Sequence, residues 1–373
     1  MTLLSGSRES SGKVRVPALP ITVPSRIKVL QELFLSEPKS RADIARATDL
    51  TKVTVSDAVE ALRGMGLIEE LESEREARPG KPSTPIRIRP DSFAVLGVDL
   101  SDADHWSYSW VGLDGGLLSV ETVDRRGAKG DQFLRDLAKT LRTAIDSAPY
   151  PVMGVGVGSP GVISRDGVVL EATNLGWHDL PVRDILHDAL GLPVVVENDA
   201  HLAALAERTF RTSRDYSLIV RIAEGVGAGL VVEGTVPSGS ANAAGELGHT
   251  VVVEGGNPCG CGKRGCLEAY LAAPVVERRI DETSVEEALS VAGDMLGAAV
   301  APIVGLLNLR SVVISAPDLY RHELFLSRTS AAIADRTLPR SHQDLSVEFS
   351  DFAHDIVLRG AAGRVMSELL GLV

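Results

Sequence analysis

Four potential metal ligands lie close together in the C-terminal half of the chain. His249, Cys259, Cys261 and Cys266 follow the spacing H-x9-C-x-C-x4-C, and glycines separate the three thiols. One imidazole and three thiolates are the ligand set of a closed tetrahedral zinc site, which leaves no open position for activating water. These residues therefore predict a structural Zn²⁺. The alternative is a set of three reduced cysteines in a glycine-rich loop.

Two carboxylates flank this loop, which spans residues 249–268. Glu246 lies three residues before His249, and Glu268 lies two residues after Cys266. A metal ion that fixes the loop would therefore also fix both carboxylates.

The segments that must position this loop alternate between strand and helix patterns. A first set comprises apolar runs at 95–100, 106–111 and 117–123 and a helical segment at 132–147. A second set comprises runs at 152–157, 194–197, 217–222 and 228–232 and a helix at 199–210. This repetition predicts two α/β lobes with a ligand cleft between them. The apolar helical segments 285–309 and 352–370 could form a dimer surface or a packed core.

Residues 24–90 have the pattern of three helices followed by a hairpin. Apolar spacing predicts a helix over 25–36 that ends before Pro38. Ser40, with Asp43 at the capping-box position, can begin a second helix, and Thr51 can begin a third.

The third helix of this segment has the features of a DNA recognition helix. Val55, Val59 and Leu62 share one face, whereas Lys52, Thr54, Ser56 and Asp57 point outward. A basic wing tip with Arg78 and Lys81 follows and could approach the DNA backbone or minor groove. We therefore predict a winged helix-turn-helix whose DNA contacts are Lys52, Thr54, Ser56, Arg78 and Lys81. The alternative is a three-helix protein-interaction module with a solvated hairpin.

Charge is distributed unevenly along the chain. The 373 residues carry a net charge of −12, but residues 1–90 hold 15 basic and 12 acidic side chains and are net positive. This asymmetry fits a DNA-contacting head on an acidic body. Residues 1–23 lack a secretory signal and are expected to be a flexible tail, and the apolar stretch 298–309 is too short to span a membrane. We expect a cytoplasmic protein.

Five segments make the chain resemble the ROK family of bacterial sugar kinases and sugar-responsive repressors. They are Gly156-Val-Gly-Ser-Pro-Gly161, Glu197-Asn-Asp199, Gly225-Val-Gly-Ala-Gly229, Gly245-Glu-Leu-Gly-His249 and Cys259-Gly-Cys-Gly-Lys-Arg-Gly-Cys-Leu-Glu268. The last two are highly specific. The resemblance implies an actin-like, hexokinase-like two-lobe α/β ATPase fold for residues 91–373.

The resemblance also implies a sugar pocket. The matching positions here are Gly161, Asn198, Asp199, Glu246, His249 and Glu268. In the kinases the aspartate that matches Asp199 is the general base, whereas in a sensor it can simply accept a sugar hydroxyl. Asn198 and Asp199 could equally cap the helix that follows. One departure is His201, where the family often has asparagine; it could alter ligand choice or face the core.

The phosphate-binding loop of the kinases is altered in this chain. The family's Asp-x-Gly-Gly-Thr is replaced by Asp99-Leu-Ser-Asp-Ala-Asp104, which places Asp102 and Asp104 where an anion would bind. The paired glycines beneath the adenosine correspond to residues 313–316, which contain no glycine, although Gly225, Gly227 and Gly229 persist. We therefore expect no kinase activity, with Asp199 as a relic of the catalytic base.

Together these patterns predict a DNA-binding repressor of carbohydrate-metabolism genes. Its expected partners are a double-stranded DNA operator, a sugar or sugar derivative, and further copies of the chain as a homodimer or dimer of dimers, with no membrane partner. Two alternatives stay open: an active sugar kinase with an added DNA-binding head, and a ligand-independent DNA-binding scaffold. The sequence does not identify the sugar or the operator.

Overall fold

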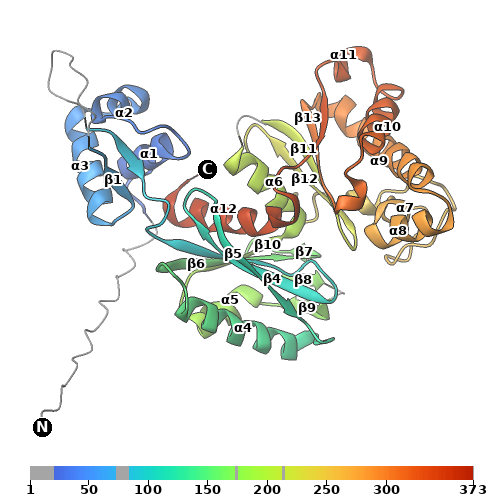
Figure 1. The fold of residues 1–373 in the computed structure, drawn as a ribbon, viewed down its shortest axis with the longest axis horizontal. Coiled ribbons are helices and arrows are strands. Elements are labelled where there is room, and N and C mark those ends of the chain that lie inside the picture. Colours follow the sequence, from blue (N-terminus) through green and yellow to red (C-terminus); the bar gives the residue numbers. More distant parts are fainter. Residues whose placement is uncertain (1–20, 73–83, 173–174, 212–214, 373) are drawn as a thin grey trace, which may run out of the picture.

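The structure, a computed structural model, describes residues 21–72, 84–172, 175–211 and 215–372. The molecule is elongated, with a small N-terminal head at one end and two α/β lobes beyond it (Figure 1). The predicted wing contacts Arg78 and Lys81, and most of the predicted N-terminal tail, lie outside the described residues.

The head consists of three helices and a two-stranded antiparallel sheet. The elements are α1 (Pro24–Leu33), α2 (Arg41–Thr48), α3 (Lys52–Gly64), β1 (Ile68–Glu70) and β2 (Ile86–Ile88). Both predicted caps are confirmed: Ser40 and Asp43 form a complete capping box, and the side chain of Thr51 accepts the N–H of Thr54. The first helix ends earlier than predicted, because Phe34 is extended and Leu35 adopts a positive φ of 49°.

The first lobe is built on a five-stranded sheet in the order β10-β6-β3-β4-β5. Strands β10, β6 and β3 are parallel, and β4 and β5 are antiparallel to their neighbours. Helices α4 and α5 cover one face (Figure 1). The bounds are β3 (Ala94–Asp99), β4 (His105–Gly112), β5 (Leu117–Asp124), α4 (Gly130–Asp146), β6 (Val152–Ser159), α5 (Val182–Leu190) and β10 (Val194–Asn198).

A small three-stranded sheet, which the sequence patterns did not predict, extends from this lobe. It consists of β7 (Val162–Ile163), β8 (Val169–Ala172) and β9 (Trp177–Leu180). It begins directly after the turn at Gly161.

The second lobe has a four-stranded sheet in the order β12-β11-β13-β14. Helices α7 to α10 pack on one face of it. The bounds are β11 (Tyr216–Ile222), β12 (Val226–Val232), α7 (Glu268–Leu271), α8 (Ala273–Glu282), α9 (Val285–Leu307), β13 (Ser311–Ser315), α10 (Glu323–Ala334), α11 (Pro339–His342) and β14 (Ser346–Phe349), with 3₁₀ turns at Leu247–His249, Asp318–Tyr320 and Ala353–Asp355.

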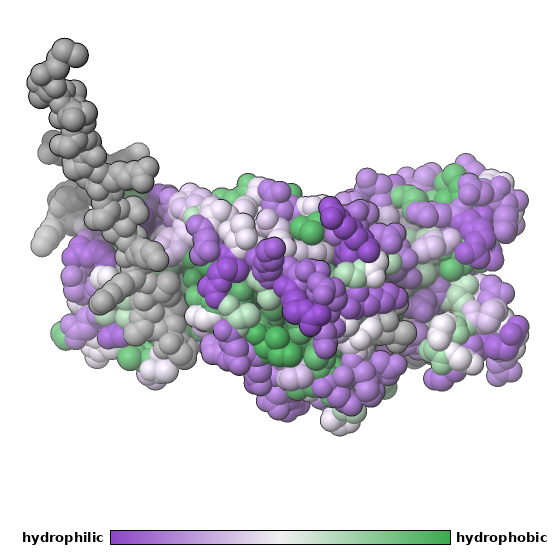
Figure 2. Space-filling model, turned by 90° about the horizontal axis from the view of Figure 1, so that it is seen from below, coloured by the Kyte–Doolittle hydropathy of each residue, from purple (hydrophilic) through white to green (hydrophobic). Residues whose placement is uncertain are grey.

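Helix α9 confirms the apolar helical segment predicted at 285–309 and is longer than the apolar stretch 298–309. Its 23 residues are long and apolar enough to cross a membrane by length and composition alone, but half of its most apolar window is buried inside the protein. Its buried side chains belong to the core of the second lobe, where α9 packs against α10. The face seen in Figure 2 is mostly hydrophilic, and its apolar side chains gather near the middle of the molecule.

Two helices lie between the sheets of the two lobes. Helix α6 (Asp199–Phe210) packs on β11 and β12, and α12 (Ile356–Leu370) packs on β3, β6 and β10. The two helices cross closely at Gly360: a Cβ at this position would come within 2.0 Å of the carbonyl oxygen of Leu202. A shift of one helix must therefore displace the other.

The head and the first lobe share one continuous apolar core. Side chains of α1 and of the C-terminal half of α12 belong to the same buried cluster. The N–H of Ile21 donates to the carbonyl of Leu369 at 2.8 Å, and the amide of Gln31 donates to the carbonyl of Gly371 at 2.7 Å. The rings of Phe34, just after α1, and Phe210, the last residue of α6, lie 6.2 Å apart. The head is thus attached to both central helices.

Candidate functional site

The four predicted metal ligands converge at one point in the second lobe. The ligand atoms of His249, Cys259, Cys261 and Cys266 all lie within 4.8 Å of one another. The His249 Nδ1 to Cys259 Sγ distance is 3.6 Å, and the Sγ atoms of Cys261 and Cys266 are 3.7 Å apart. With bonds of about 2.3 Å to sulfur and about 2.0 Å to nitrogen, a tetrahedral zinc site has S–S edges of about 3.8 Å and N–S edges of about 3.5 Å. The ligand set therefore fits Zn²⁺.

The thiols of this cluster differ in their surroundings. Burial raises the pKa of Cys259 to about 12 and also raises the pKa of Cys266, whereas the backbone N–H of Lys263 lowers the pKa of Cys261. Two of the three thiols thus need a cation nearby to be present as thiolates at neutral pH. A bound zinc ion would supply that charge.

The carboxylates beside the cluster join it to the rest of the second lobe. Glu268 Oε2 accepts the N–H of Val226, at the start of β12, at 3.1 Å, while its Oε1 lies 3.6 Å from Cys259 Sγ. Glu246 Oε2 lies 3.9 Å from Nε2 of His249. His249 therefore turns one ring nitrogen toward the thiols and the other toward Glu246.

The side chain of Glu246 is 43% exposed and lies near two further carboxylates. Burial is the main cause that raises the pKa of Glu246; nearby His249 lowers it, and the charges of Asp199 and Glu268 add to the rise. Three carboxylates from separate segments thus lie within electrostatic reach of one another. Such a group of acceptors suits a neutral polyol.

The Asn198-Asp199 pair lies at the N-terminus of α6 and connects to the Gly161 turn. The Oδ1 of Asn198 accepts the N–H groups of Ala200 and His201, and its Nδ2 donates to the carbonyl of Gly161 at 2.9 Å. Asn198 is therefore the helix cap that the sequence left as an alternative. Its capping also places Asp199 and the Gly161 turn next to each other.

The segment that carries Glu246 is pressed against β12. Gly245 has φ +91°, and a Cβ there would come within 1.9 Å of the carbonyl oxygen of Ala228. Only glycine fits such an approach. The motif that identifies this segment in the sequence thus reflects close backbone packing.

His201 faces the interior rather than the sugar side. Its Nε2 lies 2.8 Å from the carbonyl oxygen of Ala244 and its Nδ1 lies 3.3 Å from Oε1 of Glu197, and only 4% of the residue is exposed. Burial opposes protonation, but the hydrogen bond to Glu197 and the charge of that carboxylate outweigh it, so the pKa of His201 is raised. His201 therefore braces the backbone next to Gly245.

The loop at residues 99–104, which matches the phosphate-binding loop of the kinases, accepts its own backbone N–H groups with its own carboxylates. The Oδ1 of Asp99 accepts the N–H of Ser101 at 2.9 Å, and the Oδ1 of Asp102 accepts the N–H groups of Asp104 and His105, each at 2.8 Å. A loop that binds phosphate does so with free backbone N–H groups, and these three already have acceptors. The loop between β3 and β4 is thus occupied by its own carboxylates.

Glu224 adds a further negative charge beside this loop. Burial raises the pKa of Glu224, and the charges of Asp102, Glu277 and Asp104 raise it further. Glu224 directly precedes the persistent glycines at 225, 227 and 229. Those glycines are retained, but the electrostatics next to them disfavour an anion.

The sequence analysis missed one charged residue that lies between the two lobes. Arg221 on β11 reaches Oδ2 of Asp99 and Oδ2 of Asp199, each at 3.4 Å. The signal for it was a lone cation in an otherwise apolar strand, Leu218-Ile-Val-Arg-Ile222.

In the head, the predicted recognition residues lie on the outer side of α3. Lys52 and Ser56 are exposed, whereas Val55, Val59 and Leu62 are buried. Thr54 is half-buried, and its hydroxyl lies 2.9 Å from that of Thr51. Thr54 therefore also helps to close the turn before α3.

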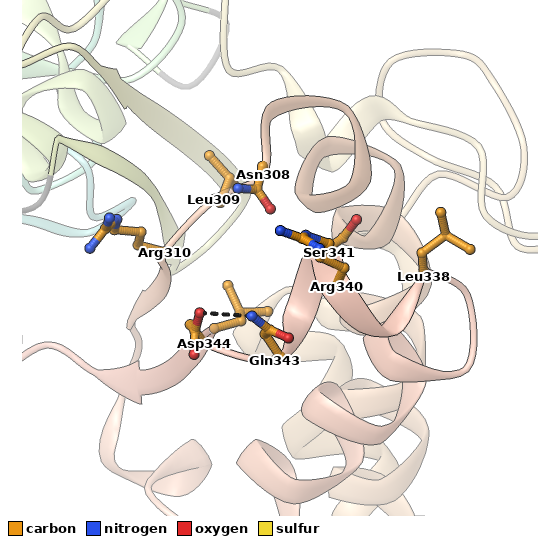
Figure 3. A pocket seen from close by; sticks show the side chains of 9 residues that line it. Asn308, Leu309, Arg310, Leu338, Arg340, Ser341, Gln343 and Asp344 are labelled. Carbon is orange, nitrogen blue, oxygen red and sulfur yellow. Dashed lines mark hydrogen bonds between the residues drawn. The ribbon is translucent and has the colours of Figure 1, made fainter.

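One hollow lies away from these residues, at the far end of the second lobe. Its volume is about 630 Å³. Figure 3 shows the hydrogen bond from Gln343 to Asp344 on its wall, and Arg310 pointing away from Arg340. None of the predicted sugar contacts lines it. Its walls are formed by Asn308, Leu309, Arg310, Leu338, Arg340, Ser341, Gln343, Asp344 and Leu345.

Comparison with known proteins shows similarity over the head as well as the body. A model of the ROK family matches residues 95–293. The xylose repressor of Caldicellulosiruptor bescii is 26% identical over 93% of this chain and 96% of its own length.

Two solved structures delimit the shared fold. A ROK family transcriptional regulator, described as a homolog of the E. coli MLC protein, has a TM-score of 0.80 at 24% identity and covers 93% of this chain and 96% of its own. A ROK family glucokinase from Streptomyces griseus, in complex with glucose and AMPPNP, has a TM-score of 0.64 at 23% identity and covers 72% of this chain and 98% of its own. The predicted fold class is confirmed.

Proposed function

Because the chain belongs to the ROK family, we propose that it is a transcriptional repressor of carbohydrate-metabolism genes whose binding to operator DNA is controlled by a sugar. Residues 24–90 would form the DNA-binding winged helix-turn-helix, and residues 91–373 the sugar-binding body. The observation that carries the proposal is the combination of a self-bonded loop at residues 99–104 with a group of carboxylates suited to sugar hydroxyls. The xylose repressor among its relatives supports the same function.

The sugar would bind between the lobes, against residues from four segments of the chain. Asp199, Glu246 and Glu268 would accept hydroxyl hydrogens, and His249 and the Gly161 turn would complete the pocket with Asn198. A buried acceptor that a wrong sugar leaves unmatched costs about 1 to 3 kcal/mol, which is enough for selectivity.

Zinc would have an architectural role. Bound by His249, Cys259, Cys261 and Cys266, it would hold the loop that carries Glu268 against the start of β12. With four protein ligands it would have no open coordination position, so the chemistry it supplies is cross-linking.

Phosphoryl transfer is not part of this function. The N–H groups of Ser101, Asp104 and His105 already donate within their own loop. Glu224, Asp102 and Asp104 would repel the triphosphate of ATP. Asp199 would then serve only as a hydroxyl acceptor.

The head would bind DNA through the exposed side of α3. Lys52, Thr54 and Ser56 lie near its N-terminus, where a recognition helix meets base edges, and Arg78 and Lys81 would contact the backbone or minor groove from the wing. A palindromic operator would take two heads, so we propose a homodimer or a dimer of dimers. The expected location is the cytoplasm, with the operator.

The structural change on sugar binding would be transmitted to the head through α6. This helix begins at Asp199 in the pocket and ends at Phe210, whose ring contacts Phe34 beside α1. Helix α12 crosses α6 at Gly360 and shares the core of the head. A sugar that favours one lobe arrangement would therefore change the position of the head.

A ligand screen tests this proposal. Thermal unfolding of the zinc-loaded protein is followed with D-xylose, D-glucose, their phosphates and ATP, since a ligand at about 100 times its Kd adds about 2.7 kcal/mol of stability. Stabilisation by a sugar and not by ATP is expected. Stabilisation by ATP with turnover would establish the kinase alternative, and no sugar response would favour the ligand-independent scaffold.

Two variants connect the screen to DNA binding. Asp199→Ala and Glu246→Ala should abolish the sugar response and leave the affinity for DNA, selected from a random library by the wild-type protein, unchanged. Arg310→Ala, on the remote hollow, is the control and should alter neither property.

A further inference from the structure

Arg221 forms an ion-pair network with two carboxylates where the two lobes meet. Its Nη2 lies 3.4 Å from Oδ2 of Asp99, and its Nη1 lies 3.4 Å from Oδ2 of Asp199. The three side chains are only 13%, 12% and 15% exposed for Arg221, Asp99 and Asp199. One guanidinium thus serves two largely buried carboxylates, whose mutual repulsion it reduces.

The three residues come from different parts of the fold. Asp99 ends β3 and Asp199 follows β10, and these strands flank β6 in the sheet of the first lobe. Arg221 lies on β11 in the sheet of the second lobe. The guanidinium therefore bridges the two lobes, and its position between the carboxylates depends on how the lobes are arranged.

The hydrogen bonding of Asp199 leaves room for one further donor. Its Oδ1 accepts the N–H of Ala200 at 2.9 Å, and its Oδ2 faces Arg221. A carboxylate offers about four acceptor positions, so a sugar hydroxyl can still donate to Asp199. The Nε of Arg221 is buried and has no hydrogen-bond partner among the described residues.

We propose that Arg221 is a positioning residue for the sugar. It holds the Asp199 carboxylate in the orientation that accepts a sugar hydroxyl, and it joins the two lobes through its ion pair with Asp99. Sugar affinity therefore depends on how the lobes are arranged. This inference rests on the proposed function of Asp199 as a sugar acceptor. It adds a residue from the opposite lobe to the pocket.

Charge supports the assignment. Burial raises the pKa of Asp99, and Arg221 acts in the opposite direction. Without Arg221, Asp99 and Asp199 would face each other as two uncompensated acids. The orientation of Asp199 would then depend on its hydrogen bond to Ala200 alone.

The test measures sugar affinity by isothermal titration calorimetry, with D-xylose and D-glucose as probes. Lobe arrangement is followed by small-angle X-ray scattering with and without sugar. We expect Arg221→Ala to weaken binding at least about tenfold and to remove any sugar-induced change in the scattering. Arg221→Lys should recover part of the affinity, because a single ammonium cannot fork between two carboxylates.

A double variant separates positioning from folding. Removing Asp99 together with Arg221 takes away one buried acid as well as the cation, so Asp99→Ala/Arg221→Ala should regain thermal stability relative to Arg221→Ala. Its sugar affinity should stay low, because Asp199 still lacks its partner. Recovery of affinity together with stability would overturn the positioning role.

The remaining outcomes are also distinct. Affinities of Arg221→Ala within about twofold of the wild type would overturn this inference and leave the proposed function standing. A wild-type protein that binds neither sugar would overturn the proposed function, and this inference with it. Arg310→Ala again serves as the exposed-arginine control.

Discussion

Truncation of Phe210 should weaken the communication between sugar and DNA. Phe210 ends the helix that begins at Asp199, in the proposed sugar pocket, and its ring lies 6.2 Å from that of Phe34 at an interplanar angle of 56°. A hollow of about 240 Å³, lined by residues of the head and the first lobe, adjoins Phe34 and gives this ring room to move. The ring contact can therefore differ between two head positions.

The size of the effect follows from the energy of this contact. An aromatic pair in this geometry contributes about 0.5 to 1.5 kcal/mol beyond the area it buries. If the pair forms in only one of the two head positions, it can contribute at most that energy to the coupling. Phe210→Ala should therefore reduce the ratio of DNA affinities with and without sugar by about two- to twelvefold.

The assay is fluorescence anisotropy with DNA selected by the wild-type protein, measured with and without D-xylose. Sugar affinity, measured separately, should stay within about twofold, because Phe210 lies at the opposite end of α6 from Asp199. Phe349→Ala, a partly buried phenylalanine of the second lobe, controls for the general loss of a ring. An unchanged affinity ratio in Phe210→Ala, with the protein folded, would refute this route.

Three further results are expected. Cys266→Ser removes a fully buried thiol and should abolish stoichiometric zinc, measured by mass spectrometry, and lower Tm; one zinc ion retained per chain would contradict the ligand assignment. Gly161→Ala would place a Cβ 2.0 Å from the carbonyl oxygen of Glu171 at a φ of +92°. Urea unfolding should therefore show that the free energy of unfolding falls by about 1 to 3 kcal/mol or more. The control, Gly191→Ala, should lose much less stability, because Gly191 has a positive φ but open space around it. The pKa of His201 is raised above its ordinary value of 6.5, so its contribution to stability is complete below that pH and is lost as the pH rises through the folded-state value. The free energy of unfolding should therefore fall more in the wild type than in His201→Asn as the pH rises above 6.5. Equal falls would show that His201 is not the group that titrates.

Local features of the head could be read directly from the sequence. Ser40 with Asp43, and Thr51, begin helices through hydrogen bonds that span three residues, so neighbouring residues alone decide them. The end of α1 was misplaced by about one turn, because Leu35 adopts a positive φ that its residue type does not favour. Tertiary packing of Phe34 against Phe210 accompanies that turn.

The metal cluster was predictable for a similar reason. Cys259, Cys261 and Cys266 are close in sequence, and only His249 must be brought in from nine intervening residues. Residues so close in sequence can come together without the rest of the fold, and one histidine with three cysteines favours a tetrahedral metal site. The sequence therefore predicted that these four side chains converge.

The cleft could be predicted only in part. The residue types at 99–104 indicated that a phosphate would be repelled, but not that Asp102 turns back to bind the N–H groups of Asp104 and His105. Asn198 could have been a cap or a sugar contact; its bonds to Ala200 and His201 make it the cap, and its contact with a sugar stays a prediction.

What the sequence by itself determined are the features set by short-range chemistry: the helix caps, the metal spacing, and the types of residue around the altered loop. Only the tertiary structure decided that Arg221 stands between Asp99 and Asp199, residues 122 and 22 positions away in the chain. It also decided that α6 joins the pocket to the head through Phe210, and that α12 completes the core of the head. The physical reason is that an ion pair or a ring contact between distant residues depends on the packing of both lobes, which no local pattern encodes.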